Sequence, residues 1–178
     1  KGAPVLSSFT PSSGIVGTVV TITGQNFDAG SVVVKFGTGT ATEVTVVSAT
    51  QITAKVPSAG TTGKITVETA AGSGLSATDF TVIGAPAVSA FTPASGLTGV
   101  EVTITGTNFV NVNEIKFNST IVTAGNYTLV SATQIKAKVP AGAATGKISV
   151  KTPAGTGTSS ANFTVLLPPT ITSFSPAN

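Results

Sequence analysis

Apolar and polar residues alternate along this chain in short runs that are separated by glycine and proline. The run at residues 20–23 is Val-Thr-Ile-Thr, so its valine and isoleucine would point to one face of a strand and its threonines to the other. Val, Ile and Thr are β-branched, and such side chains pack well on a pleated surface. Glycine and proline between the runs are typical of turns. The pattern therefore predicts an all-β protein.

Most of the chain occurs twice. The repeated segments are APVLSSFTPSSG at 3–14 and APAVSAFTPASG at 85–96, VTITGQNF at 20–27 and VTITGTNF at 102–109, and SATQITAKVP at 48–57 and SATQIKAKVP at 131–140. Repetition over this length indicates consecutive copies of one domain. The opening segment begins once more as PPTITSFSPAN at 168–178. We predict domains over residues 1–83 and 84–167, then the first strand of a third repeat over 168–178, so that the chain is a piece of a longer array.

Each copy divides into about seven short strands with turn signals between them, which predicts a β-sandwich. Comparing the copies assigns the faces. Val19 is replaced by Glu101 and Val33 by Glu114, so these positions are expected to face water. Positions that stay large and apolar in both copies are expected to form the core. They are Val34/Ile115, Phe36/Phe117, Ile52/Ile135, Val56/Val139, Ile65/Ile148, Val67/Val150, Phe80/Phe163 and Val82/Val165.

The octapeptide that occurs twice is expected to be scaffold. Its glycine, Gly24 or Gly106, is expected to occupy a turn that needs a positive φ. The asparagine that follows, Asn26 or Asn108, is expected to bond to the local backbone as turn residues do. The phenylalanine after it would close the end of the sandwich.

The residue types that the chain lacks exclude several kinds of chemistry. There is no Cys, His or Arg among the 178 residues, which removes disulfides, thiolate nucleophiles, the usual general base and bidentate phosphate clamps. The nine lysines are spread along the chain rather than clustered, so we expect no nucleic-acid surface. The uncharged stretches are rich in Ser, Thr, Gly and Pro, so we expect no membrane insertion.

Six carboxylates remain as candidates for catalysis or metal binding. Few of them recur, since Glu68 is replaced by Lys151 and Asp79 by Asn162 in the second copy. No loop holds more than one acid, whereas a calcium site needs several clustered oxygen ligands. We therefore expect no enzyme, no metal and no cofactor.

The order of the motifs resembles the IPT/TIG family of immunoglobulin-like domains. The resemblance rests on P-x-ϕ-x-x-F-x-P-x-x-G, G-x-x-V-T-I-x-G-x-N-F, V-x-F, S-x-T-x-I-x-A-x-V-P, G-x-I-x-V and F-x-V, which occur in this order in both copies. It implies two tandem immunoglobulin-like β-sandwiches but no single activity, because function depends on the sites that a fold holds. A tandem, cysteine-free form looks most like the repeats of large bacterial surface or secreted proteins.

From this resemblance we expect a structural repeat module, a stalk or fibre shaft of an extracellular, adhesin-like bacterial surface protein. Its partners would be neighbouring repeats of the same or identical chains. The connections at residues 83–86 and 166–169 are short and contain proline, which restricts the backbone on both sides and limits the angles between neighbours.

The alternative is a glycan-binding module of a surface polysaccharide-binding protein, or one appended to a polysaccharide-degrading enzyme. Its site would lie in the loops at one end of the second domain, at Tyr127, Asn111 and Asn113. Tyr127 is the only tyrosine and tryptophan is absent, so the chain offers few of the aromatic faces on which sugars stack.

The segment 168–178 has the apolar pattern of the first strand of each repeat. Pro169, Ile171 and Phe174 correspond to Pro4, Leu6 and Phe9. A free strand exposes unpaired backbone groups, so this segment could join chains by strand addition. We expect it to be disordered in an isolated monomer and ordered where chains or successive domains meet.

Overall fold

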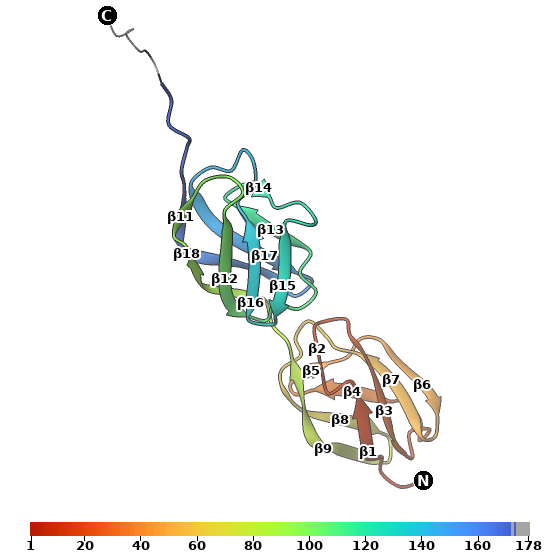
Figure 1. Cartoon of the computed structure of the whole chain (residues 1–178). Helices are drawn as coiled ribbons and strands as arrows, with labels where there is room; N and C mark the ends of the chain where they lie inside the picture. Colours follow the sequence, from red (N-terminus) through yellow and green to blue (C-terminus); the bar gives the residue numbers. More distant parts are fainter. Residues whose placement is uncertain (172, 174–178) are drawn as a thin grey trace, which may run out of the picture. The chain divides into compact units, whose positions relative to one another are not determined.

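The computed structural model describes residues 1–171 and residue 173. Contacts divide the chain into two compact units, Lys1–Gly84 and Ala85–Asn178. The described residues form 18 strands and no helix, with nine strands in each unit (Figure 1). This confirms the all-β fold and the two sandwiches. The structure has more strands than the predicted seven because each domain also contains strands of only two residues.

The first domain pairs a four-stranded sheet, in the order β1-β3-β7-β6, with a five-stranded sheet, in the order β2-β9-β8-β4-β5. The same chain therefore begins in one sheet and crosses to the other between β1 and β2. The strands are β1 Val5–Thr10, β2 Ser13–Gly14, β3 Val19–Gln25, β4 Val33–Phe36, β5 Gly39–Thr40, β6 Val44–Ser48, β7 Gln51–Lys55, β8 Gly63–Thr69 and β9 Gly72–Val82.

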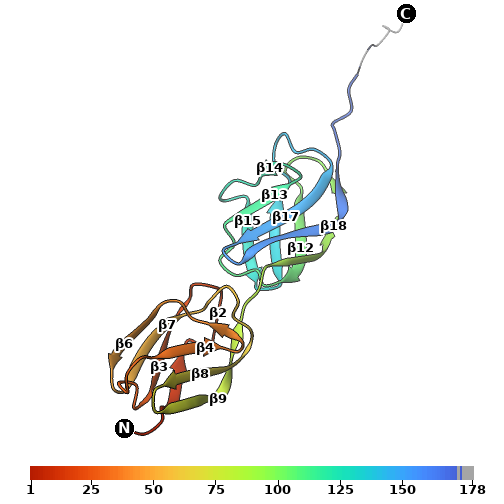
Figure 2. The same ribbon diagram turned by 180° about the vertical axis from the view of Figure 1, so that it is seen from behind.

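The second domain repeats this topology, with sheet orders β10-β12-β16-β15 and β11-β18-β17-β13-β14 (Figure 2). The chain likewise crosses from the four-stranded to the five-stranded sheet between its first two strands, β10 and β11. The strands are β10 Ala87–Thr92, β11 Ser95–Gly96, β12 Glu101–Thr107, β13 Glu114–Phe117, β14 Thr120–Ile121, β15 Tyr127–Ser131, β16 Gln134–Lys138, β17 Gly146–Thr152 and β18 Gly155–Val165.

The alternation of residues sets the face of each strand as predicted. In β3, Val20 and Ile22 are fully buried, while Val19 is half exposed. The predicted core is confirmed at every position except Val82 and Val165, which are only partly buried at the ends of β9 and β18. The two sheets of each domain thus enclose a single apolar layer.

Aromatic pairs fill the middle of both cores in the same way. The rings of Phe36 and Phe80 lie edge to face with centroids 5.1 Å apart. Phe117 and Phe163 repeat this arrangement at 5.1 Å. All four rings are buried, and edge-to-face packing adds to the stabilisation that burial provides.

The predicted positive φ at Gly24 and Gly106 is wrong. The positive φ falls two residues later, at Asn26 (63°) and Asn108 (58°). Gly24 lies within β3, where a Cβ atom would collide with the carbonyl oxygen of Val5 and with the ring of Phe27. Glycine is therefore required by the close approach of neighbouring groups, not by its own backbone conformation.

The two asparagines also differ from the prediction. They do not bond to the adjacent backbone but to the segment that leads into their own domain. The Asn26 side-chain amide donates to the carbonyl of Ala3 at 3.0 Å, and Asn108 donates to Ala85 at 3.1 Å. A left-handed backbone turns each side chain toward that segment, a conformation that asparagine tolerates better than most residues. Phe27 and Phe109, which follow, are buried as predicted.

A bulge interrupts the last strand of each domain. Residues 76–78 of β9 lie opposite the single residue Ile65 of β8. The buried hydroxyl of Ser76 fills the gap, since it accepts from the Ile65 amide at 2.9 Å and donates to the Thr78 carbonyl at 2.7 Å. Ser159 makes the same two bonds in β18. The bulge is therefore a built feature of the repeat.

Only part of the predicted third-repeat strand lies among the described residues. Residues 168–171 and residue 173 belong to no strand, and Ile171 is exposed. Phe174 lies outside the described residues, so the hypothesis of strand addition by this segment stays a prediction. None of the described residues form a helix that is long and apolar enough to span a membrane.

Candidate functional site

Tyr127 begins β15, at the edge of the four-stranded sheet of the second domain. It lies opposite Ala137, which in turn lies opposite Val102, and both of these are buried. Residues directly opposite one another share a face of a sheet, so the Tyr127 ring points inward. It is half buried and packs against the core. A ring in this position contributes to stability and offers little free face for a sugar.

Asn111 and Asn113 lie in the loop between β12 and β13, and both are exposed. Asn111 has a positive φ of 54°, and the amide of Asn113 donates to the Lys151 carbonyl at 3.0 Å. The same loop is tied to the turn between β15 and β16, because the Phe109 amide donates to the carbonyl of Ala132 at 2.9 Å.

The structure does not bring the three predicted site residues together. The loop that contains Asn111 meets the chain at Ala132, whereas Tyr127 lies opposite Ala137, at the far end of β16. The five residues of β16 separate these two points and span roughly 16 Å. Tyr127 and the two asparagines therefore lie at opposite ends of the second domain, and they cannot contact one small ligand together.

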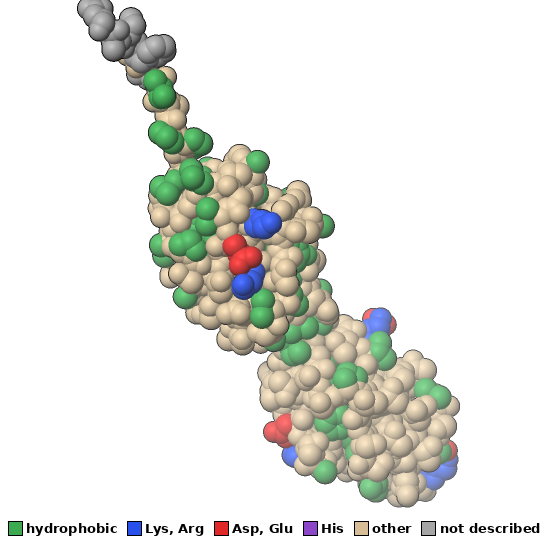
Figure 3. Space-filling view, in the orientation of Figure 1, with side chains coloured by type: hydrophobic (Ala, Val, Ile, Leu, Met, Phe, Trp, Pro, Cys, Tyr) green, Lys and Arg blue, Asp and Glu red, His purple; other side chains and the backbone are tan. Residues whose placement is uncertain are grey.

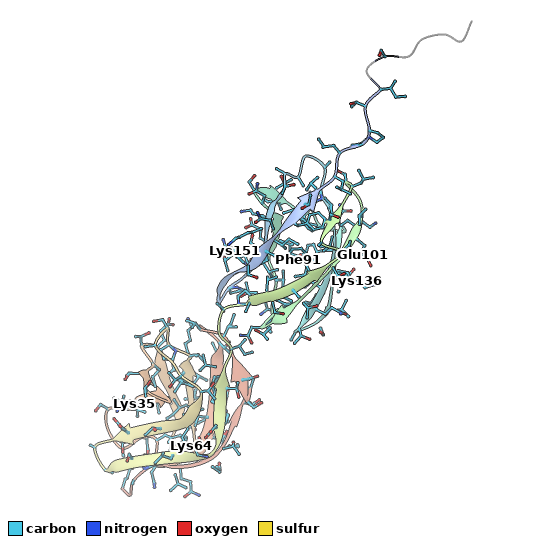
Figure 4. All side chains as sticks on the ribbon, turned by 90° about the vertical axis from the view of Figure 1, so that its left-hand side faces the viewer. Lys35, Lys64, Phe91, Glu101, Lys136 and Lys151 are labelled. Atoms are coloured by element: carbon cyan, nitrogen blue, oxygen red, sulfur yellow. The ribbon has the colours of Figure 1, made fainter. Side chains whose placement is uncertain are left out.

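A polar hollow of about 230 Å³ does lie beside Tyr127. Its lining residues come from three stretches of the chain, namely Glu101, then Gly125, Asn126, Tyr127 and Thr128, and then Lys136 and Lys138. The Lys136 ammonium lies 3.0 Å from the Glu101 carboxylate (Figure 4). A second hollow of about 320 Å³ shares Asn126 and Lys138 with the first. The first hollow is polar, whereas the second is lined largely by apolar groups; we call the two together the Lys138 hollow.

The Lys138 hollow has a smaller and electrically balanced counterpart in the first domain. There the hollow is about 80 Å³, and Lys55 forms an ion pair with Glu43 at 2.6 Å. Asn126 replaces that glutamate in the second domain, and the amide of Lys138 donates to its carbonyl as Lys55 donates to Glu43. Lys138 forms no ion pair with any described residue. Its ammonium is therefore available to an oxygen ligand such as a carboxylate or hydroxyl.

This difference could have been found in the sequence by comparing the copies position by position. Val44 becomes Tyr127 and Glu43 becomes Asn126, while Thr53 becomes Lys136. Lys136, Lys138 and Asn126 are thus the residues that sequence reasoning missed.

A second kind of hollow recurs in both domains, where the first strand passes the bulge of the last strand. In the first domain it has about 220 Å³, with Phe9 and Leu6 beside the hydroxyls of Ser8 and Ser12. In the second domain it has about 270 Å³ and includes Phe91. Because both hollows follow from the bulge that the copies share, we attribute them to the fold and not to a ligand.

The carboxylates of the described residues pair with lysine. Hydrogen bonds from Lys1 to Asp28 and from Lys116 to Glu114 hold the pKa of each carboxyl below its usual range. The face shown in Figure 3 bears only a few charged groups, with acidic and basic ones close together, on a largely uncharged surface. Among the described residues no three or more His, Cys, Asp or Glu side chains gather where they could hold a metal ion.

Comparison with known proteins identifies the domains. The sequence profile of the IPT/TIG domain matches residues 4–82 and 86–165, which together make up most of the chain. No curated protein sequence matches the chain.

Several solved structures have a similar fold. The extracellular region of plexin A4 is 20% identical, with 92% of this chain and 18% of that chain covered and a TM-score of 0.55. SGBP-B from a complex xyloglucan utilization locus in Bacteroides uniformis is 22% identical, with 91% and 49% covered and a TM-score of 0.46. A surface glycan-binding protein from Prevotella bryantii is 21% identical, with 92% and 42% covered and a TM-score of 0.44. The chain spans about half the length of these proteins or less.

The two profile matches agree with the sandwich topology and with the order of motifs in each copy. The chain belongs to the IPT/TIG family, and its two domains are consecutive members of that family.

Proposed function

We propose that this chain is a non-enzymatic structural repeat module, a spacer within the shaft or stalk of an extracellular bacterial surface protein. The observation that supports it best is the way in which each domain holds the chain at its two ends. The extracellular location and the bacterial source rest on the resemblance of these tandem, cysteine-free repeats to those of bacterial surface proteins.

Each domain fixes the segment that leads in and the segment that leads out. Asn26 and Asn108 bind the incoming segment through the carbonyls of Ala3 and Ala85. At the other end, the amide of Ile83 donates to the Gly14 carbonyl at 2.8 Å. The second domain repeats this bond, from Leu166 to Gly96 at 2.9 Å. The same two connections, one at each end, therefore recur in both domains, as a head-to-tail array requires.

These bonds leave a very short connection between the domains. Ile83 is held by the first domain and Ala85 by the second, so only Gly84 lies between the two fixed points. Consecutive Cα atoms are about 3.8 Å apart, so this connection is shorter than roughly 8 Å. A spacer that keeps neighbouring domains at a fixed distance needs such short connections.

Rotational diffusion tests the proposal. We expect ¹⁵N relaxation to give both domains of the parent chain one long correlation time. Insertion of Gly-Ser-Gly after Gly84 should give each domain a shorter correlation time of its own, without changing the melting temperature of either. Independent tumbling of the two domains in the parent chain would contradict the role of a stiff spacer.

The Lys138 hollow favours a second candidate, a glycan-binding module. The second domain has a larger hollow than the first, together with an additional lysine and an unpaired ammonium on Lys138 among the described residues. We propose that an oxygen-rich saccharide would bind here, with Lys138 and Asn126 as hydrogen-bond donors, and not at Asn111 or Asn113.

Calorimetric titration with neutral and uronate-containing polysaccharides tests this candidate. Lys138→Gln should abolish saturable binding, and Lys55→Gln is the matched control in the first domain. We prefer Lys138→Gln to Tyr127→Ala because Tyr127 packs against the core and its loss would change stability as well. No saturable binding to either class of polysaccharide in the parent chain would leave the spacer function alone.

A further inference from the structure

The sheets of both domains differ in how their edges are protected. The five-stranded sheets end in strands of only two residues, β2 and β5 in the first domain and β11 and β14 in the second. One edge of each four-stranded sheet, β1 or β10, packs against the last strand of the facing sheet. Short or covered edges present few unpaired backbone groups to another chain.

The remaining edges are β6 and β15, and neither is protected in this way. Each has five residues without a charge or a proline, VTVVS in β6 and YTLVS in β15. In Figures 1 and 2, β6 lies at the margin of the first domain. Natural edge strands commonly bear lysine or proline, which prevent pairing with another chain.

Inward-pointing apolar side chains are also partly exposed to solvent at these edges. Val46 lies opposite the buried Ile52 and therefore points inward, yet 41% of its surface is exposed. Leu129 lies opposite the buried Ile135 in the same way and is 43% exposed. One more strand beside β6 or β15 would cover these side chains, provided that its own inward residues were apolar.

The free backbone groups fall at known positions. The Lys55 amide donates to the carbonyl of Glu43, so hydrogen-bonded pairs toward β7 recur at every second residue from there. Val44 and Val46 therefore direct their N–H and C=O groups away from the sheet. In the second domain the Lys138 amide donates to Asn126, which leaves Tyr127 and Leu129 free in the same way.

We propose that β6 and β15 are docking edges for a second copy of this chain, which pairs with them in antiparallel fashion. A two-fold axis through Thr45 would place Val44 opposite Val46 of the other copy, so that both free residues exchange hydrogen bonds. The same axis through Thr128 would pair Tyr127 with Leu129. The apolar face of both copies would then lie on one side of a continuous eight-stranded sheet.

The sequence of the edge itself identifies the second copy as the occupant. An added strand must be uncharged, must alternate apolar and polar residues, and must place the apolar ones inward. Residues 44–46 of β6 and 127–129 of β15, which the two-fold axis would pair, meet all three conditions when they face themselves. This lateral pairing is separate from the head-to-tail arrangement of domains, so either proposal can fail without the other.

Single cysteines test the geometry, because the chain has no cysteine of its own. Thr45 and Thr128 would each face their own copy in a pair that lacks hydrogen bonds across the new interface. Cα atoms in such pairs are about 4.5 Å apart, within the range of about 4.4–6.8 Å that a disulfide spans. Thr23→Cys on the central strand β3 is the matched control, since Thr23 is exposed as Thr45 and Thr128 are, and its neighbours on both sides are strands of its own sheet.

Under mild oxidation we expect Thr45→Cys or Thr128→Cys to form disulfide dimers about tenfold faster than Thr23→Cys, because pairing raises the local thiol concentration. Val46→Lys in the Thr45→Cys background should abolish this advantage. Val33→Lys is its control, since the second domain has Glu114 at that position. Equal rates for all three cysteine variants, or unchanged dimer formation with Val46→Lys, would overturn the proposal.

Discussion

The two domains agree in what they bury and differ in what they expose. Phe36 and Phe80 of the first domain correspond to Phe117 and Phe163 of the second, with the same centroid separation of 5.1 Å. In contrast, Glu43 at the polar rim of the first domain becomes Asn126 in the second.

The contrast shows where the fold allows change. A buried position is constrained by many close neighbours, whereas an exposed side chain is replaced at little cost in stability. The Lys138 hollow of the second domain is larger than its counterpart in the first domain and differs from it in charge. The features that the copies share support the proposed spacer function, whereas the differences between them support the proposed ligand site in the second domain.

The strongest test of this contrast concerns the cores. Phe36→Ala and Phe117→Ala should each destabilise their own domain by about 3–5 kcal/mol, because each removes a buried ring and leaves a cavity. The two losses of stability should be similar, since each ring packs against an equivalent phenylalanine at the same distance. Denaturant unfolding followed by NMR signals of each domain measures them separately. A loss confined to one of the two variants would break the equivalence of the cores.

The close approach at the glycines of β3 and β12 gives the next largest effect. Gly24→Ala and Gly106→Ala should cost up to about 3 kcal/mol, because the added methyl group collides with a backbone carbonyl and with a buried ring. Gly99→Ala serves as a control for positive φ in open space, since no atom lies within 4 Å of its Cβ position. Thermal melts that rank Gly99→Ala as the more damaging variant would contradict the steric explanation.

The serine of the bulge should have a smaller effect. Ser76→Ala and Ser159→Ala each remove the acceptor for a buried amide, of Ile65 or Ile148, at a cost of about 1–3 kcal/mol. Hydrogen exchange of these two amides should accelerate in the variants. Unchanged exchange would show that water replaces the hydroxyl, and the bulge would then depend on the backbone alone.

The smallest expected effect is on the stability of each domain at acidic pH. The carboxyls of Asp28 and Glu114 have a lowered pKa in the folded chain because Lys1 and Lys116 donate to them. Their contribution is therefore present above the unfolded pKa values of about 3.9 and 4.3, and it is lost as the pH falls through the lower folded values. Asp28→Asn should remove this acid dependence from the first domain only, and Glu114→Gln from the second only. Melting temperatures at neutral and acidic pH measure the difference.

Much of the fold could be predicted because strand faces depend on a period of two residues. That period assigned Val20, Ile22 and nearly all other core positions correctly, since each side chain needs only its neighbours in sequence to define its face. The repetition of motifs in order was enough to recognise the family, which the profile matches then confirmed. These properties are local, so the sequence by itself determined them.

The tertiary structure alone decided which distant groups meet. The pairing of strands places Tyr127 far from Asn111. It places Tyr127 beside Lys138 instead, in the lining of one hollow. Gly24 is required by the carbonyl of Val5, and Asn26 reaches Ala3, although both partners lie far away in sequence. The open edge at β6 likewise exists only because β7 covers one side of it and no described strand covers the other. Such contacts depend on how the sheets are ordered and packed, which alternation along a single strand does not specify.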